Sequence, residues 1–215
     1  GDRLAGDPDV PGADAMSAGL GGRVVALVCR GSEADRAIAV ELAEAGADIA
    51  LATVTRAQDE EFQTASIANE IWAIGREQMN LVIDAADPVA VAAFAAEVCD
   101  RMGRCDALVF SPGAVAEIPF DELSRDEWDP LVERTVTAWL FCAQAFGRVI
   151  ERAGGNGALM LAAEQADWTP SGHAINGALA GAVAGLQATY AGRGVQVASC
   201  GAADAAARVR VLLNP

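Results

Sequence analysis

The chain contains one histidine, His173, and an imidazole is the side chain that most readily donates or accepts a proton near neutral pH. A catalytic histidine usually has a second group that orients its ring. Glu164 and Asp167 precede His173, and either carboxylate could serve that purpose. A lone histidine near the start of a helix is more often a capping or solvated residue. The sequence therefore leaves His173 open between acid–base chemistry and a structural role.

A second candidate site follows the first apolar run. Arg30 and Ser32 could hold a phosphate, because a guanidinium and a hydroxyl both donate hydrogen bonds to phosphate oxygens. Glu33 and Asp35 come next, in the expected first turn of a helix, where the helix dipole stabilises carboxylates and where they would repel a bound anion. We expect Ser32 to cap this helix, with phosphate binding as the alternative.

The composition excludes several classes of function. All 15 basic residues are arginines, so a mechanism that requires a lysine is impossible. The 30 acidic residues bring the net charge to -15, which would repel nucleic acids and anionic lipid surfaces. No apolar run approaches the roughly 18 residues that span a bilayer. We expect neither a nucleic-acid nor a membrane partner.

The cysteines indicate the compartment. They are scattered, they form no CxxC pair, and one histidine adds little to a metal site. We predict no metal, a cytoplasmic location, and reduced cysteines in the core at positions 29, 99, 105, 142 and 200.

Short apolar runs alternate with longer segments of helical periodicity, which is typical of β-α-β units in a parallel sheet. The expected strands are 23–29, 48–53, 80–83, 107–110, 158–161 and 195–200. One helix should begin at Asp87 and end at Gly103, and another should run from a capping box at Ser124 to about Arg152. Pro130 requires either an irregular first turn in that helix or a cap at Asp129.

These elements predict an α/β fold, with a three-layer, doubly wound parallel sheet in a single domain over residues 22–215. Residues 1–21 are rich in Gly, Asp, Pro and Ala, and we expect a flexible N-terminal arm or a non-native extension left by cloning. Met16 is a candidate for the native start.

Several segments resemble the short-chain dehydrogenase/reductase (SDR) family: 22–28 for the first strand, 36–51 for the first helix and second strand, and 103–109 before the fourth strand. The resemblance extends in register from about Gly22 to Cys200, and it implies a Rossmann-like sheet. Residues 204–215 resemble a late helix of the family. The segment that covers the substrate and the final strand have no counterpart, which implies a shortened C-terminal region.

The resemblance also implies where the family binds its nicotinamide cofactor. The family's TGxxxGxG loop is one residue short here and keeps only Gly31, while the position of the ribose-binding acid is Thr53. Asp84 corresponds to an aspartate on the adenine side but also suits a helix entry. Beside the nicotinamide the family has an Asn-Asn-Ala-Gly segment. The aligned segment here keeps the glycine as Gly113 and has neither asparagine. We expect no functional cofactor site; NAD or NADP would bind only if this interpretation of the loop is wrong.

The family's catalytic residues are a tyrosine, a lysine, a serine and an asparagine. By this resemblance, the positions of the tyrosine, the lysine and the asparagine are occupied by His173, Gly177 and Thr135. No serine follows the strand that ends at Leu161. The one tyrosine, Tyr190, lies seventeen residues beyond the aligned position. We expect no catalytic residue of the family type.

These losses predict a non-catalytic SDR-like subunit that forms a homo-oligomer or a hetero-oligomer with an active SDR relative. Two alternatives remain: an enzyme with cofactor-independent chemistry that uses His173, and a nucleotide or ligand sensor with a remodelled pocket.

The predicted contact uses two long helices, 124–152 and 172–191. Apolar bulk on the first helix comes from Ala138, Leu140, Phe141, Ala145 and Phe146. On the second helix, Gly177, Gly181 and Gly185 would let another backbone approach, or would instead seat the helix on its own sheet.

Overall fold

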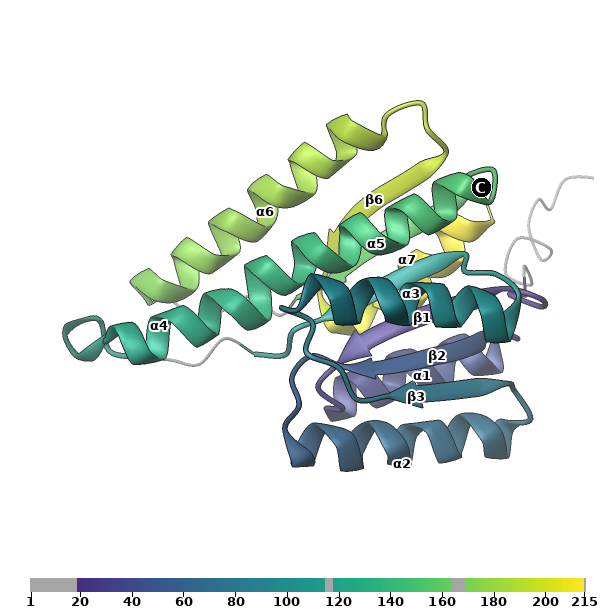
Figure 1. The fold of residues 1–215 in the computed structure, drawn as a ribbon, viewed down its shortest axis with the longest axis horizontal. Helices are drawn as coiled ribbons and strands as arrows, with labels where there is room; N and C mark the ends of the chain where they lie inside the picture. The colour runs from purple at the N-terminus through teal and green to yellow at the C-terminus, as the bar shows by residue number, and fades with distance from the viewer. Residues whose placement is uncertain (1–18, 115–117, 164–168, 215) are drawn as a thin grey trace, which may run out of the picture.

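The computed structural model describes residues 19–114, 118–163 and 169–214, which form helices on both faces of one parallel sheet (Figure 1). The strand order is β3-β2-β1-β4-β5-β6. The strands are β1 (Val24–Cys29), β2 (Asp48–Thr53), β3 (Gln78–Leu81), β4 (Ala107–Ser111), β5 (Gly157–Ala162) and β6 (Val195–Cys200). The predicted fold class is therefore confirmed.

The third strand lies two residues earlier than predicted. It begins at Gln78, which pairs with Ile49 of β2, and it ends at Leu81. The apolar pattern pointed to residues 80–83, but Ile83 lies beyond the strand. There it bonds through its backbone to the Thr53 hydroxyl, which donates to the Ile83 carbonyl at 2.8 Å and accepts from the Ile83 amide at 2.9 Å.

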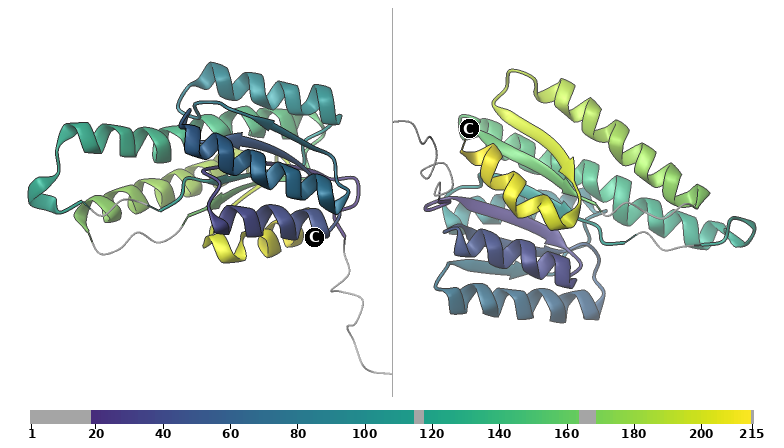
Figure 2. Two further views of the ribbon diagram at one scale, coloured as in Figure 1. Left: turned by 90° about the horizontal axis from the view of Figure 1, so that it is seen from below. Right: turned by 180° about the vertical axis from the view of Figure 1, so that it is seen from behind.

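Two helical layers cover the sheet (Figures 1 and 2). One layer contains α1 (Glu33–Glu44), α2 (Gln58–Ile74) and α7 (Ala205–Leu213). The other contains α3 (Pro88–Met102), α5 (Ala138–Arg152) and α6 (Pro170–Tyr190). Alternate side chains of each strand enter opposite cores: Val25 and Leu27 pack toward α1, and Ala26 and Val28 toward α3. None of the helices in the described ranges combines the length and apolarity needed to cross a membrane.

The helix ends follow the sequence signals. Asp87 caps α3 by accepting a hydrogen bond from the Val89 amide at 2.9 Å, and Gly103 ends that helix with a φ of 79°. Ser124 forms the predicted capping box with Glu127, whose carboxylate accepts from the Ser124 amide at 3.0 Å. The alternative cap at Asp129 is therefore wrong.

The long helix after Ser124 is interrupted rather than continuous. Pro130 lies inside α4 (Arg125–Val132), and the next five residues form a π-helical turn, η3 (Glu133–Thr137), before α5 begins. Proline removes one backbone donor, and the wider turn that follows is a common irregularity near functional sites. In Figure 1, α4 and the start of α6 extend beyond the carboxyl ends of the strands.

The structure separates the residues that were expected to form a contact with another chain. Ala138 and Phe146 are fully buried in the chain's own core, so they cannot form such a contact, whereas Leu140 is 42% exposed. A Cβ on Gly177, Gly181 or Gly185 would meet no atom within 4 Å. These glycines therefore do not seat α6 on its own sheet.

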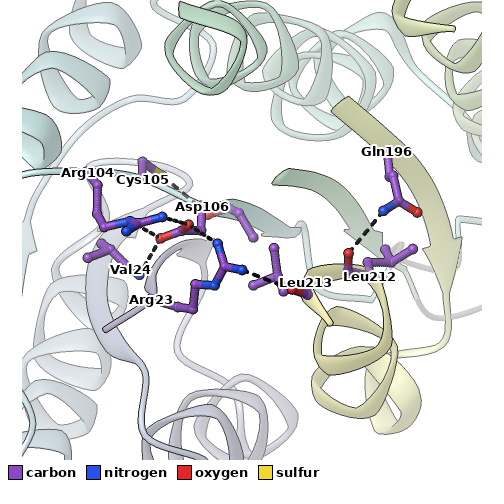
Figure 3. Close-up of polar contacts among 9 residues, drawn as sticks. Arg23, Val24, Arg104, Cys105, Asp106, Gln196, Leu212 and Leu213 are labelled. Carbon is purple, nitrogen blue, oxygen red and sulfur yellow. Dashed lines mark hydrogen bonds and ion pairs between the residues drawn. The ribbon is translucent and has the colours of Figure 1, made fainter. Parts of the chain in front are cut away.

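A buried carboxylate lies at the amino edge of the sheet, where the strands begin (Figure 3). Asp106 is 4% exposed and accepts hydrogen bonds from the Val24 amide at 2.9 Å, from Arg23 Nη1 at 2.7 Å and from Arg104 Nε at 2.8 Å. Arg23 Nη2 also donates to the carbonyl of Leu213 at 3.2 Å. Asp106 therefore connects β1, β4 and the C-terminal helix.

We expect Asp106→Asn to lower the free energy of unfolding by about 3 kcal/mol, because two arginines lose their buried counter-charge. Urea denaturation followed by circular dichroism measures this loss. The matched control, Asp126→Asn on the exposed first turn of α4, should stay within about 0.5 kcal/mol of the parent. Equal losses in the two variants would contradict the assigned role of Asp106.

Candidate active site

The strand order places one crevice where ligands bind in sheets of this type. The chain leaves β1 toward β2 and β3 and then crosses to β4 on the other side of β1. Ligands of doubly wound sheets bind outside the carboxyl ends of the strands at this reversal. Cys29 of β1 lies in register with Ser111 of β4, so the residues that directly follow these two strands lie side by side at this reversal.

The start of α1 is occupied by its own side chains. The Asp35 amide donates to Ser32 Oγ at 3.2 Å, and the Asp35 carboxylate accepts from the Ser32 amide at 2.8 Å. The expected cap at Ser32 is confirmed. Two amides that a glycine-rich loop would offer to a diphosphate are therefore already bonded.

Gly31 serves packing between the first loop and α2. Its φ is +80°, and a Cβ there would lie 2.3 Å from the Cβ of Gln63. The glycine is therefore required by a contact within the chain, and this requirement is independent of any ligand.

An ion pair fixes the direction of Arg30. Its Nε donates to Glu60 Oε1 at 2.7 Å, while Glu60 Oε2 accepts from the Thr55 amide at 2.7 Å. Glu60 is 2% exposed, whereas the side chain of Arg30 is 38% exposed. Gly113, with a φ of +75°, lies under Arg30, since a Cβ there would be 3.1 Å from Arg30 Cδ. Arg30 thus bridges the loops after β1 and β4.

A second guanidinium interacts electrostatically with Arg30 and Glu60. Arg134 lies on η3, and its Nε is buried without a hydrogen-bond partner among the described residues. Burial lowers the pKa of Arg134, the charge of Arg30 lowers it further, and the Glu60 carboxylate raises it. Two cations therefore act on one buried carboxylate. The sequence analysis singled out Arg30 but missed Arg134, although it directly precedes the aligned position Thr135.

The positions aligned with the nucleotide-binding acids stabilise the fold locally. Thr53 is fully buried, and its hydroxyl is used by Ile83 as described above. Asp84 Oδ1 accepts from the Ala86 amide at 2.9 Å and so supports the turn that leads into α3. The chain therefore uses both side chains to connect β2, β3 and α3.

The positions aligned with the catalytic residues lie on two neighbouring elements. The Thr135 hydroxyl donates to the Leu131 carbonyl at 2.6 Å and is buried, and Gly177 lies on the exposed face of α6. His173 is exposed near the start of α6, and its backbone amide donates to the Thr169 carbonyl at 2.9 Å. The helix α6 packs against η3, so it borders the segment that holds Arg134. Glu164 and Asp167 lie outside the described residues.

Tyr190 is far from this site. It ends α6, seventeen residues after His173, which corresponds to roughly 25 Å along a helix. Its hydroxyl packs against α5, since a Cβ on Gly147 would lie 1.9 Å from that oxygen, and Arg193 stacks over its ring at 5.2 Å. Burial raises the pKa of Tyr190. The tyrosine therefore packs between α5 and α6, away from the crevice.

The strand order and the two helical layers together define a doubly wound, Rossmann-like fold. A family profile described as Enoyl-(Acyl carrier protein) reductase matches residues 35–205. The chain belongs to the short-chain dehydrogenase/reductase family.

Three similar proteins are informative. D-threitol dehydrogenase from Mycolicibacterium smegmatis is 31% identical over 83% of this chain and 68% of its own length. 2-Dehydro-3-deoxy-D-gluconate 5-dehydrogenase from Pseudoalteromonas atlantica is 29% identical over 75% of this chain, which spans only 64% of that relative's length. A crystal structure from Beutenbergia cavernae, described as a candidate NAD(P) dependent gluconate 5-dehydrogenase with bound NADP at low occupancy, is 27% identical with a TM-score of 0.72. The match covers 85% of this chain and 72% of that structure.

These similarities correct two expectations. The prediction of a non-catalytic subunit is contradicted, because the relatives aligned with most of the chain are named as dehydrogenases. The prediction that no cofactor is used is contradicted too, because the Beutenbergia protein is described as NAD(P) dependent and holds NADP. The first prediction rested on the missing catalytic and cofactor-binding residues, and the second on the shortened loop after β1, on Thr53 and on the lost amides beside Gly113.

We expect Gly31→Ala to lower the free energy of unfolding by about 3 kcal/mol, because the new methyl group would overlap the Cβ of Gln63. Gly75→Ala is the control, since Gly75 has a φ of +90° but no atom near its Cβ position. That variant should lose about 1 kcal/mol from backbone strain alone. Thermal unfolding of both variants measures the difference, and an equal loss would contradict the packing role of Gly31.

Proposed function

We propose that the chain is a nicotinamide-dinucleotide-dependent oxidoreductase that interconverts an alcohol and a carbonyl group. The relatives named above support this proposal, because dehydrogenases align with 75% to 83% of the chain. Their names refer to threitol and to a gluconate derivative, which both have several hydroxyl groups. A polyhydroxylated compound is therefore the proposed class of substrate.

The diphosphate of such a cofactor needs hydrogen-bond donors that are not already bonded within the chain. The α1 amides do not fit a diphosphate in the present structure, since Ser32 and Asp35 bond to each other. The buried Nε of Arg134 does fit, because it is a cationic donor at the carboxyl edge that has no acceptor among the described residues. When bound, the nicotinamide ring would supply or accept the hydride. The observation that favours this function is thus the buried, unsatisfied Nε of a half-buried arginine on η3 of a Rossmann-like fold.

We further propose that the chain handles the proton without the family's residues. The chain has no lysine, Thr135 bonds to the backbone of its own helix, and Gly177 has no side chain. His173 is then the titratable group at the aligned positions, and its imidazole can exchange a proton with the substrate oxygen or with water. In the oxidation of an alcohol, a neutral imidazole would accept the hydroxyl proton.

The expected result is reduction of NAD⁺ or NADP⁺ by one or more members of a panel of polyols and sugar acids, followed by the absorbance of reduced nicotinamide. His173→Gln should lower kcat by about 100-fold and leave dinucleotide affinity unchanged. No turnover above a blank with any substrate and either dinucleotide would sink the proposal.

We also propose that the chain assembles with a second copy of itself through α6. This helix of 21 residues contains no charged residue, and its glycine positions are open. Its exposed face includes Ala174, Ala178, Gly181 and Gly185. An extended uncharged face of small residues lets another helix approach closely, and a two-fold axis would pair the face with itself.

Size-exclusion chromatography with light scattering should give at least a dimer at micromolar concentration. Gly181→Arg should convert it to a monomer, because a long cation would stand in the contact. Val89→Arg is the control, since Val89 is an exposed apolar residue on α3, away from this face. A monomeric parent chain would contradict this assembly.

A further inference from the structure

We propose that Arg30 and Arg134 hold the dinucleotide diphosphate, which then lies over the loops after β1 and β4, beside η3, and not at the start of α1. The inference rests on the proposed function and assigns to it a binding site that the glycine-rich loop no longer provides. The anion would lie between the two guanidinium groups and close to Gly113, where Arg30 crosses the loop after β4.

The charges of the cluster favour an anion. Arg30, Arg134 and Glu60 give a net charge of +1 in a chain whose total is -15. Both oxygens of Glu60 are already bonded, to Arg30 Nε and to the Thr55 amide. Glu60 therefore directs Arg30 but has no bond to Arg134 among the described residues. A bound anion would supply the hydrogen-bond acceptor that Arg134 does not obtain from Glu60.

Arg134 differs from the other residues that keep an unsatisfied buried atom. In the described part of the chain these residues are Asp35, Arg36, Asn80, Arg134 and Trp139. Asn80 and Trp139 are neutral, the other oxygen of Asp35 caps α1, and Arg36 pairs with Glu70. Arg134 is the charged residue in this set whose side chain makes no hydrogen bond or ion pair with another described residue. A half-buried cation without an acceptor is costly unless a ligand supplies one.

The chemistry of guanidinium matches this ligand. Its planar donors bind two phosphate oxygens at once, and it stays charged when partly buried. A diphosphate offers oxygens to both arginines, so neither has to move onto the occupied start of α1. The chain can therefore bind the cofactor with a self-capped helix and a single glycine in its first loop.

The test uses the full chain and isothermal titration with NADPH, together with thermal unfolding of the free protein. Arg134→Met should weaken NADPH binding about 30-fold, which corresponds to about 2 kcal/mol. The same variant should raise the melting temperature of the free protein, because it removes an unpaired buried charge. A structural arginine would behave in the opposite way, with a lower melting temperature and unchanged affinity.

Two further variants complete the design. Arg134→Lys keeps the charge but loses the planar fork, so it should weaken binding about 5-fold and fold as the parent does. Arg208→Met, an exposed arginine on α7, changes the charge equally and should leave the affinity unchanged. If the parent binds NADPH and both Arg134 variants bind it equally well, this inference is overturned while the proposed function stands. If the parent binds no NADPH, the proposed function falls as well.

Discussion

One buried carboxylate organises the carboxyl edge of the sheet. Glu60 is almost wholly excluded from solvent, and its two oxygens bind the Arg30 guanidinium and the Thr55 amide. The burial of an ionised carboxylate is tolerated only when such partners are present. The pair joins the loop after β1, the loop after β2 and the first turn of α2. Because Glu60 directs Arg30 across Gly113, it also decides where positive charge is available in the crevice.

The two edges of the sheet differ in how well their polar groups are satisfied. At the amino edge, Asp106 accepts from two arginines and a backbone amide, and the cluster is complete without a ligand. At the carboxyl edge, Arg134 keeps a buried donor for which no described residue supplies an acceptor. A satisfied cluster stabilises the fold, whereas an unsatisfied one retains binding energy for a partner. We therefore assign a stabilising role to the Asp106 cluster and the proposed binding site to the edge that holds Arg134.

The sequence predicted most of the framework because its signals are local. Asp87 and Gly103 mark the ends of α3 by their own conformational preferences, and Ser32 does so for α1. The third strand was misplaced because its start is set by pairing with Ile49, which is a long-range contact. The π-helical turn that presents Arg134 was not predicted, because nothing near Pro130 specifies its length. The prediction of an inactive subunit was wrong because it compared motifs position by position, whereas the relatives that align with most of the chain are named as dehydrogenases.

The most direct measurement is a crystal structure of the chain with NADP⁺. The account predicts a bound dinucleotide whose diphosphate oxygens lie within hydrogen-bond distance of Arg134 Nε and of the Arg30 guanidinium, with the Ser32–Asp35 capping box intact. A diphosphate bound instead to the opened first turn of α1, with Arg134 turned away from it, would contradict the account.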